Sequence, residues 1–412
     1  MDGKVPKKLL WICFAAETFF GSYGLLLGSN AGIASVLYLM AGMGFIVALL
    51  WLPEIRLNIR SVSDPFGIRV KWALALLMVL LAWVTARYWL EEIPIDTDYA
   101  DMLPVIRVMN ERFLSGHWKQ VYDPISEIWN GTHPGYLPAM WLPYLSAVHF
   151  GFDMRWITVA CLLSCFSAFL FFLRLTKRNL YGWLTIAVSA LLFWWIFARN
   201  DIHGVITLSE EGPVILFHVM LCFAIASGNI YFIAVSASLC LLSRYCMIGW
   251  VLPFLLILLT RKRYKQAFLF SAIGIGCFLL FFLIPFGTIP VQQLIHLPGD
   301  YIAFASRVWH DTPEVFWLNP GLAKFFGPHR TVQLHQALVD GSFLIPLAFA
   351  LLCLRKTFRF NNISLATLKL SLLVFFQFID VPYGYLFYTA SFVSLAIAGM
   401  AGTADKVSAQ LR

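Results

Sequence analysis

Long apolar runs recur along almost the whole of this chain. An α-helix needs about 20 apolar residues to cross the hydrocarbon core of a bilayer, and runs near that length occupy residues 33–51, 72–90, 180–197 and 267–285. Inside a bilayer the backbone finds no water to bond with, so a crossing segment must be a helix or part of a closed barrel. The sequence therefore predicts an all-α, polytopic transmembrane helical bundle of about eleven to thirteen spans, forming one membrane domain over residues 1–412.

Composition and charge agree with this interpretation. The chain is 60% hydrophobic and 13% charged, whereas a soluble domain carries about 25% charged residues. Its net charge of +8 lies mainly in short clusters that end apolar runs: Lys4–Lys8, Arg56–Lys71, Arg174–Arg178, Arg261–Lys265 and Arg355–Arg359. Basic clusters of this kind mark cytoplasmic connections. The positive charge thus predicts a membrane topology, and nucleic acid is not a predicted partner.

Two polar stretches are too long to be simple connections: Glu91–Gly135 and Phe286–Asp340. Counting spans from the basic clusters places both on the extracytoplasmic face, and long ordered loops commonly carry function. The first stretch contains eight acidic and three basic residues. Residues 136–150 are short for a span, and a full crossing there would put Arg174–Arg178 outside, so we expect a partial or re-entrant segment.

Helical spacing within the first stretch predicts an amphipathic helix at the membrane surface. Its apolar face comprises Met102, Val105, Ile106, Met109 and Phe113. Its polar face comprises Arg107, Asn110, Glu111 and Arg112. Gly116 is placed to end the helix.

Three carboxylates precede this predicted helix: Asp96, Asp98 and Asp101. A carboxylate at the bilayer edge is suited to act as general base on a hydroxyl group. Crowding of like charges should raise the pKa of at least one of the three. The alternative is a solvated acidic loop in which Asp101 caps the following helix.

Arg244 is the only charged residue between Glu211 and Arg261. Charged groups at membrane depth are costly and usually functional, and a guanidinium matches a phosphate group bidentately. We therefore assign Arg244 to a phosphate site. The alternative is an ion pair with Glu210 or Glu211 inside the bundle.

Other candidate residues lie at the same predicted face. Arg199 and His203, in a short polar loop, are further candidates for phosphate contacts, although a lone histidine is more often structural. A groove is predicted from Tyr122, His133, Tyr136, Glu210, Glu211 and Tyr245. The alternative for residues 116–138 is a rigid entry into a helix, shaped by prolines.

In their joint order these motifs resemble the GT-C superfamily of membrane glycosyltransferases, in its polyprenyl-phosphate-sugar-dependent, mannosyltransferase-like branch. The resemblance rests on Asp101 followed by Gly116, then Tyr122-Asp123-Pro124, Tyr136-Leu137-Pro138, Arg244-Tyr245 and Arg261-Lys262-Arg263. The chain departs from the family pattern where Arg244-Tyr245 replaces Lys-Pro and where only one proline follows Tyr136. It departs again at Glu210-Glu211-Gly212.

The resemblance implies an inverting transfer of sugar from a polyprenyl-phosphate donor to a hydroxyl of a glycan or lipid acceptor. Asp101 matches the family base best, with Asp98 and Asp96 just upstream. No cofactor or metal is expected, and a bacterial inner membrane is the expected location. A transporter or flippase for a lipid-linked saccharide is the alternative, although no clear internal repeat is visible. A non-catalytic scaffold would leave the three aspartates without a role.

Overall fold

The structure is a computed structural model, and within the part of the chain that it describes all regular structure is helical. The described residues are 4–22, 30–57, 65–97, 100–128, 133–172, 180–198, 204–355 and 360–403.

Seven helices within these ranges are long and apolar enough to cross a bilayer. They are α2 (Ala31–Trp51), α3 (Pro65–Glu92), α7 (Arg155–Phe172), α8 (Leu180–Ala198), α12 (Tyr264–Phe278, continued to Phe286), α16 (Thr331–Cys353) and α18 (Phe387–Thr403). Four shorter apolar helices accompany them: α9 (Glu211–Ser227), α10 (Ile230–Leu241), α11 (Ile248–Thr260) and α17 (Ile363–Phe378). Helix α1 (Lys4–Ser22) begins within the first basic cluster. The predicted polytopic helical bundle is therefore confirmed.

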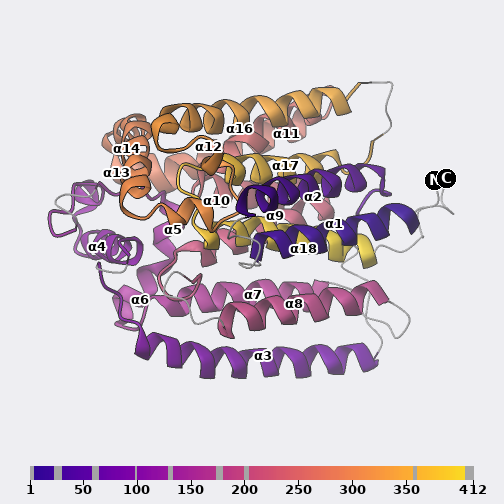
Figure 1. Cartoon of the computed structure of the whole chain (residues 1–412), viewed down its shortest axis with the longest axis horizontal. Coiled ribbons are helices and arrows are strands. Elements are labelled where there is room, and N and C mark those ends of the chain that lie inside the picture. The colour runs from indigo at the N-terminus through magenta and orange to yellow at the C-terminus, as the bar shows by residue number, and fades with distance from the viewer. Residues whose placement is uncertain are drawn as a thin grey trace.

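The long helices lie side by side, and short helices gather at one end of the bundle (Figure 1). These short helices are α4 (Met102–Leu114), α5 (Pro138–Trp141), α6 (Leu145–Phe150) and α13 (Ile284–Phe286), together with α14 (Ile289–Asp311). We name this the Asp101 end. The first turn of α1 and the last turn of α18 lie at the opposite end, which we name the basic end.

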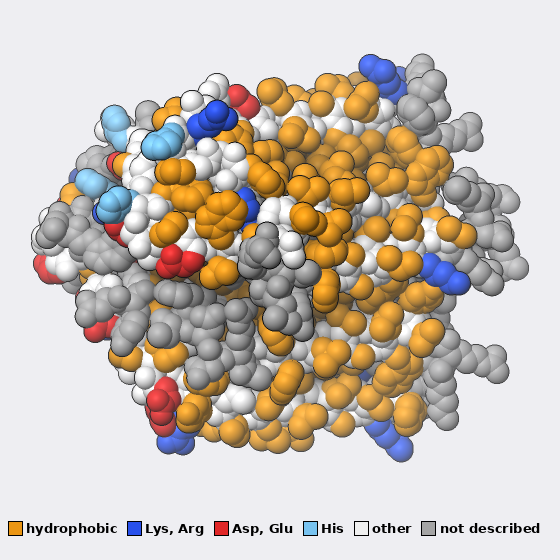
Figure 2. All heavy atoms as spheres, in the orientation of Figure 1, with side chains coloured by type: hydrophobic (Ala, Val, Ile, Leu, Met, Phe, Trp, Pro, Cys, Tyr) orange, Lys and Arg blue, Asp and Glu red, His pale blue; other side chains and the backbone are white. Residues whose placement is uncertain are grey.

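Apolar side chains cover much of the flank between the two ends, and acidic and histidine side chains gather at the Asp101 end (Figure 2). Helix α3 shows this clearly, because Trp72, Leu76 and Val84 are all more than 60% exposed. An apolar surface this extensive is expected to contact lipid. The chain is thus a multi-pass protein built for a membrane.

Residues 136–150 do not form one continuous helix. They fold into α5, a 3₁₀ turn at Leu142–Tyr144 and α6, which ends where Gly151 adopts a φ of +70°. Trp141 and Tyr144 are fully buried against α4. Because this segment stays at the Asp101 end, α7 ends and α8 begins at the basic end (Figure 1), which agrees with the topology that the positive charge of the Arg174–Arg178 cluster predicts.

Helix α4 follows Asp101, and Gly116 beyond it has a φ of +81°. The buried residues of helix α4 include Leu103, Val105, Ile106 and Met109. They also include Asn110, which we had expected on the polar face. The Asn110 side-chain amide donates to the carbonyls of Ile106 at 2.9 Å and Trp141 at 3.1 Å. Hydrogen bonding to α5 therefore makes the buried face wider than the apolar pattern indicates.

The second polar stretch is more helical than the sequence suggested. It contains α14, the short helix α15 (Glu314–Trp317) and the first ten residues of α16. Leu334 and Leu338 are buried in those first turns of α16, so helix packing begins within the stretch that we had expected to be a polar loop.

Candidate functional site

Arg244 lies at a break between two helices. Helix α10 ends at Leu241 and α11 begins at Ile248, and Arg244 between them is extended, with φ −142° and ψ 138°. The carbonyl of Leu242 accepts a hydrogen bond of 2.9 Å from the Ala139 N–H of α5. This contact stands in for the helical bonds that the break removes.

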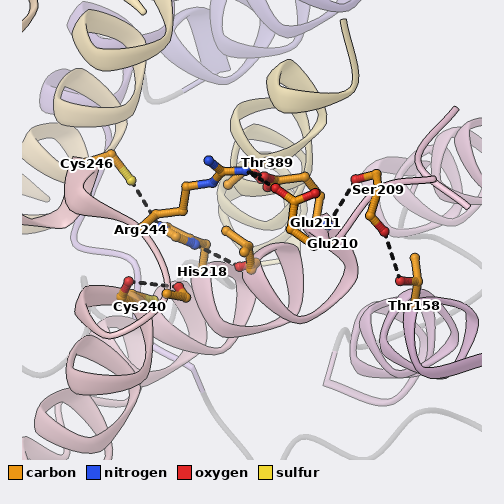
Figure 3. A network of polar contacts seen from close by, with 11 residues as sticks. Thr158, Ser209, Glu210, Glu211, His218, Cys240, Arg244, Cys246 and Thr389 are labelled. Atoms are coloured by element: carbon orange, nitrogen blue, oxygen red, sulfur yellow. Dashed lines mark hydrogen bonds and ion pairs between the residues drawn. The ribbon is translucent and has the colours of Figure 1, made fainter. Parts of the chain in front are cut away.

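The Arg244 side chain reaches two glutamates at the start of α9 (Figure 3). Its Nη2 lies 3.0 Å from Glu210 Oε1 and also pairs with Glu211. The side chains of Glu210 and Glu211 are 3% and 0% exposed, and that of Arg244 is 17% exposed. The partial positive charge of a helix N-terminus favours acids at this position. The ion pair weighed as an alternative from the sequence is therefore present, with both glutamates.

Gly212 allows the start of α9, which carries the two glutamates, to pack closely against α7. A Cβ at that position would come within 2.6 Å of the Thr158 Cα on α7. Glu211 is then held by its own N–H, which donates to Ser209 Oγ at 3.0 Å, and by Thr389 of α18, whose hydroxyl donates to Glu211 Oε2 at 3.3 Å. Thr389 of α18 and Arg244 between α10 and α11 thus hold the carboxylate, and Ser209 holds the backbone of the same residue.

Several buried polar atoms around this ion pair have no hydrogen-bond partner in the described part of the chain. They are Glu210 Oε2, Arg244 Nε and, two residues beyond the end of α17, Asp380 Oδ1; the other Asp380 oxygen, Oδ2, pairs with His335 Nδ1 at 2.8 Å. Buried polar atoms are nearly always paired in folded proteins. Two carboxylates also face one guanidinium, so these three side chains carry a net negative charge when both carboxylates are ionised.

Asp101 lies close to this group. It occupies the N-cap position of α4, but its side chain makes no capping hydrogen bond to that helix. Burial, and next the charge of Glu210, raise the pKa of the Asp101 carboxyl to about 6, and Arg307 opposes the rise. The capping role considered for Asp101 is therefore not what the structure displays.

Tyrosines from three further segments surround these charges. Burial, followed by the charges of Asp101 and Glu210, raises the pKa of the Tyr136 hydroxyl. The pKa of Tyr301 on α14 is raised by burial, although the positive charge of Arg244 opposes the rise. Burial and the charge of Asp101 raise the pKa of Tyr383 to about 12. The Arg244 cluster is defined as the following residues: Asp101, Tyr136, Glu210, Glu211, Arg244, Tyr301 and Tyr383.

A cavity of about 230 Å³ opens beside the Arg244 cluster. Its lining consists of Tyr122, His133, Pro134, Pro290, His296, Leu297 and Asp300. Gly135 joins the two, because its carbonyl accepts from the Tyr245 hydroxyl at 3.4 Å. A Cβ on Gly135 would lie 3.3 Å from Leu297 and 3.6 Å from the Tyr301 hydroxyl.

The structure brings most of the sequence-predicted residues together. Tyr245 lies against Gly135, and Tyr122 and His133 line the adjoining cavity. Asp96 is exposed, and its carboxylate accepts from the Thr97 hydroxyl at 3.3 Å. The remaining predicted residues lie outside the described residues: Asp98, Arg199 and His203.

Sequence reasoning missed three contributors to this site: Gly212, Tyr301 and Thr389. Gly212 was noted only as part of a motif departure, and Tyr301 and Thr389 stand in segments rich in aromatic and hydroxyl residues. Their roles come from contacts between distant helices, for which the local sequence carries no signal.

No group of three or more His, Cys, Asp or Glu side chains suited to a metal ion occurs in the described ranges. Comparison of the chain with protein-family models, with curated proteins and with solved structures finds no match in any of the three.

Proposed function

We propose that this chain is a membrane glycosyltransferase of GT-C type that transfers a sugar from a polyprenyl-phosphate donor to an acceptor hydroxyl. Asp101 takes the hydroxyl proton, and the oxygen attacks the anomeric carbon. The bond from that carbon to the phosphate oxygen breaks, the configuration inverts, and the polyprenyl phosphate leaves with the bonding electron pair. The donor carries its own leaving group, so the balance requires no further reactant.

The position and acidity of Asp101 support its role as base. A general base works best when its pKa lies close to the operating pH, and the pKa of Asp101 is raised to about 6 by burial and by Glu210. Its carboxylate is not occupied in capping α4. It therefore remains able to accept a proton from a bound hydroxyl.

The role of Arg244 is narrower than the sequence suggested, because Glu210 and Glu211 already engage one of its terminal nitrogens. Its Nε–H is unpartnered within the described ranges, and we assign this donor to a phosphate oxygen. Arg307 is a further cation near this site, and its charge reaches Asp101. Hydrogen-bond donors and cations at the leaving phosphate stabilise the charge that develops there.

The observation that carries the proposal is the set of buried polar atoms without a partner among the described residues. Two of these atoms belong to the Arg244 cluster, and the third belongs to Asp380, whose charge reaches Tyr301 of that cluster. Glu210 Oε2 and Asp380 Oδ1 are acceptors, and sugar hydroxyls are donors of matching chemistry. A ligand rich in hydroxyl groups and bearing one phosphate would satisfy these acceptors together with Arg244 Nε–H.

The test is sugar transfer by the purified full-length chain with a panel of polyprenyl-phosphate sugars. Asp101→Asn should lower the transfer rate by about 10²–10⁴-fold, which is the usual contribution of a positioned base. Asp96→Asn, at an exposed carboxylate, is the matched control and should retain activity. Full activity of Asp101→Asn with every accepted donor would overturn the assignment of the base.

A further inference from the structure

A second cavity, of about 200 Å³, opens at the basic end of the bundle. Its apolar wall includes Ile225, Ile233 and Phe254, and its polar rim includes Arg261, Arg263 and Asn361. It lies between the ends of α9 and α11 and the starts of α10 and α17. None of its lining residues belongs to the Arg244 cluster.

The rim of this cavity carries an excess of positive charge. Arg261 and Arg263 flank Lys262 in the turn between α11 and α12, and all three side chains are exposed. Glu54 also lines the cavity, but its carboxylate is paired with Arg56 at 2.8 Å. Neither rim arginine forms an ion pair with a described residue, and Glu54 is the one acid among the described lining residues.

The backbone maintains this basic turn in an uncommon conformation. Lys262 has a φ of +57°, where a helix normally ends in glycine. The turn is closed by the N–H groups of Lys262 and Arg263, which donate to Leu259 and Leu258 at 2.9 Å. A lysine at this position keeps a cation in the turn despite the steric cost of the left-handed region.

Helix starts at the same cavity contribute further positive potential. Asn362 precedes α17 but does not cap it, because its amide donates to the carbonyls of Leu49, Leu52 and Pro53. By contrast, Asn229 caps α10 by accepting from two backbone N–H groups. The start of α17, which has no side-chain cap, thus lines a cavity rimmed by arginines, an arrangement that favours anions.

We propose that this cavity binds an anionic phospholipid, with its phosphate at Arg261 and Arg263 and the upper part of an acyl chain against Ile225 and Phe254. An apolar wall below a basic rim matches an amphiphile with an anionic head. The cavity also lies at the end that the basic clusters predict to be cytoplasmic, where anionic lipids meet basic pockets between helices. The proposal is independent of sugar transfer at Asp101.

The experiment measures lipid binding to the purified full-length chain by native mass spectrometry, with diacyl phosphatidylglycerol and diacyl phosphatidylcholine as probes. Arg261→Gln with Arg263→Gln should weaken phosphatidylglycerol binding by about 30-fold and leave phosphatidylcholine binding unchanged. Arg69→Gln with Arg355→Gln removes the same charge from exposed sites at the same end and should have little effect.

Two further measurements separate the cavity from a general attraction of lipid to a basic surface. Ile225→Phe narrows the cavity without changing its charge. This variant should bind phosphatidylglycerol more weakly, while its melting temperature in phosphatidylcholine stays unchanged. Equal loss in the Arg69 and Arg355 double variant would overturn the proposal. So would inorganic phosphate that displaces the lipid at equal concentration, because the site would then recognise a free anion.

Discussion

Two buried charge groups within this bundle differ in how completely their polar atoms are paired. In mid-bundle, Lys369 of α17 pairs with Glu17 of α1, and both side chains are at most 1% exposed. Ser394 donates to the second Glu17 oxygen at 3.1 Å, and Lys369 also donates to the Ala390 carbonyl at 3.4 Å. One acid thus meets one base, and both oxygens of the acid are used.

The Arg244 cluster has the opposite character. Two glutamates share one arginine, Asp101 lies beside them, and Glu210 Oε2 and Arg244 Nε are unpartnered among the described residues. A buried pair whose hydrogen bonds are satisfied is a structural element, whereas unsatisfied polar atoms indicate a place for a ligand. The comparison therefore separates a charge group that holds helices together from one that is available for chemistry.

The largest effect is expected when the mid-bundle pair is broken. Lys369→Met leaves Glu17 buried without its cation, which should lower the free energy of unfolding by about 3–5 kcal/mol. Reversible unfolding in mixed micelles measures the change. Glu17→Gln combined with Lys369→Met should recover most of the loss, and failure of this rescue would contradict a purely structural role for the pair.

A smaller loss of stability is expected at Gly212. In Gly212→Ala the new methyl group meets the backbone of Thr158, so α9 must move away from α7 at a cost of about 1–3 kcal/mol. Sugar transfer should fall as well, because Glu211 moves with the helix. Gly276→Ala on α12, where a Cβ meets nothing within 4 Å, is the matched control. Equal stability of the two variants would argue against close packing as the reason for Gly212.

Asp101→Asn should stabilise the protein above pH 6 although it slows sugar transfer. The folded state raises the pKa of this carboxyl from about 3.9 to about 6, so the folded protein binds the proton more tightly than the unfolded chain. Ionisation therefore costs stability as the pH rises from about 4 to 6, by about 1–2 kcal/mol after allowance for partial exposure. Melting temperatures from pH 4 to 8 test this expectation. A gain that does not disappear toward pH 4 would point to another cause.

The smallest effect is expected at Glu210, and it concerns the pH profile of kcat/KM. Removing this charge by Glu210→Gln should lower the pKa of Asp101, so the acidic limb of the profile moves below pH 6. At neutral pH the weaker base should reduce kcat/KM by roughly a few-fold. Asp300→Asn, which alters an exposed acid of the adjoining cavity, should leave the limb in place. If the acidic limb of the pH profile stays in place in Glu210→Gln, the charge of Glu210 does not control the pKa of the base.

The sequence predicted the parts of this architecture that depend on local pattern. Apolar runs predicted the bundle, and the lone charge at Arg244 predicted either a phosphate site or an ion pair with Glu210 or Glu211. The pattern did not predict that Asn110 is buried, because its partner Trp141 lies 31 residues away. Lys369 and Glu17 are 352 residues apart, and the packing of α1 and α17 against both α2 and α18 brings them together.

Helix α18 connects the two charge groups mechanically. Its Thr389 bonds Glu211, the carbonyl of the next residue accepts from Lys369, and Ser394 bonds Glu17. A rigid helix transmits an axial shift along its whole length. The position of Thr389 relative to Glu211 is therefore set partly by the bonds that Ala390 and Ser394 form with Lys369 and Glu17 further along α18. The position of the acidic residues at the start of α9 thus depends partly on α1, a helix that forms none of the hydrogen bonds described above with them.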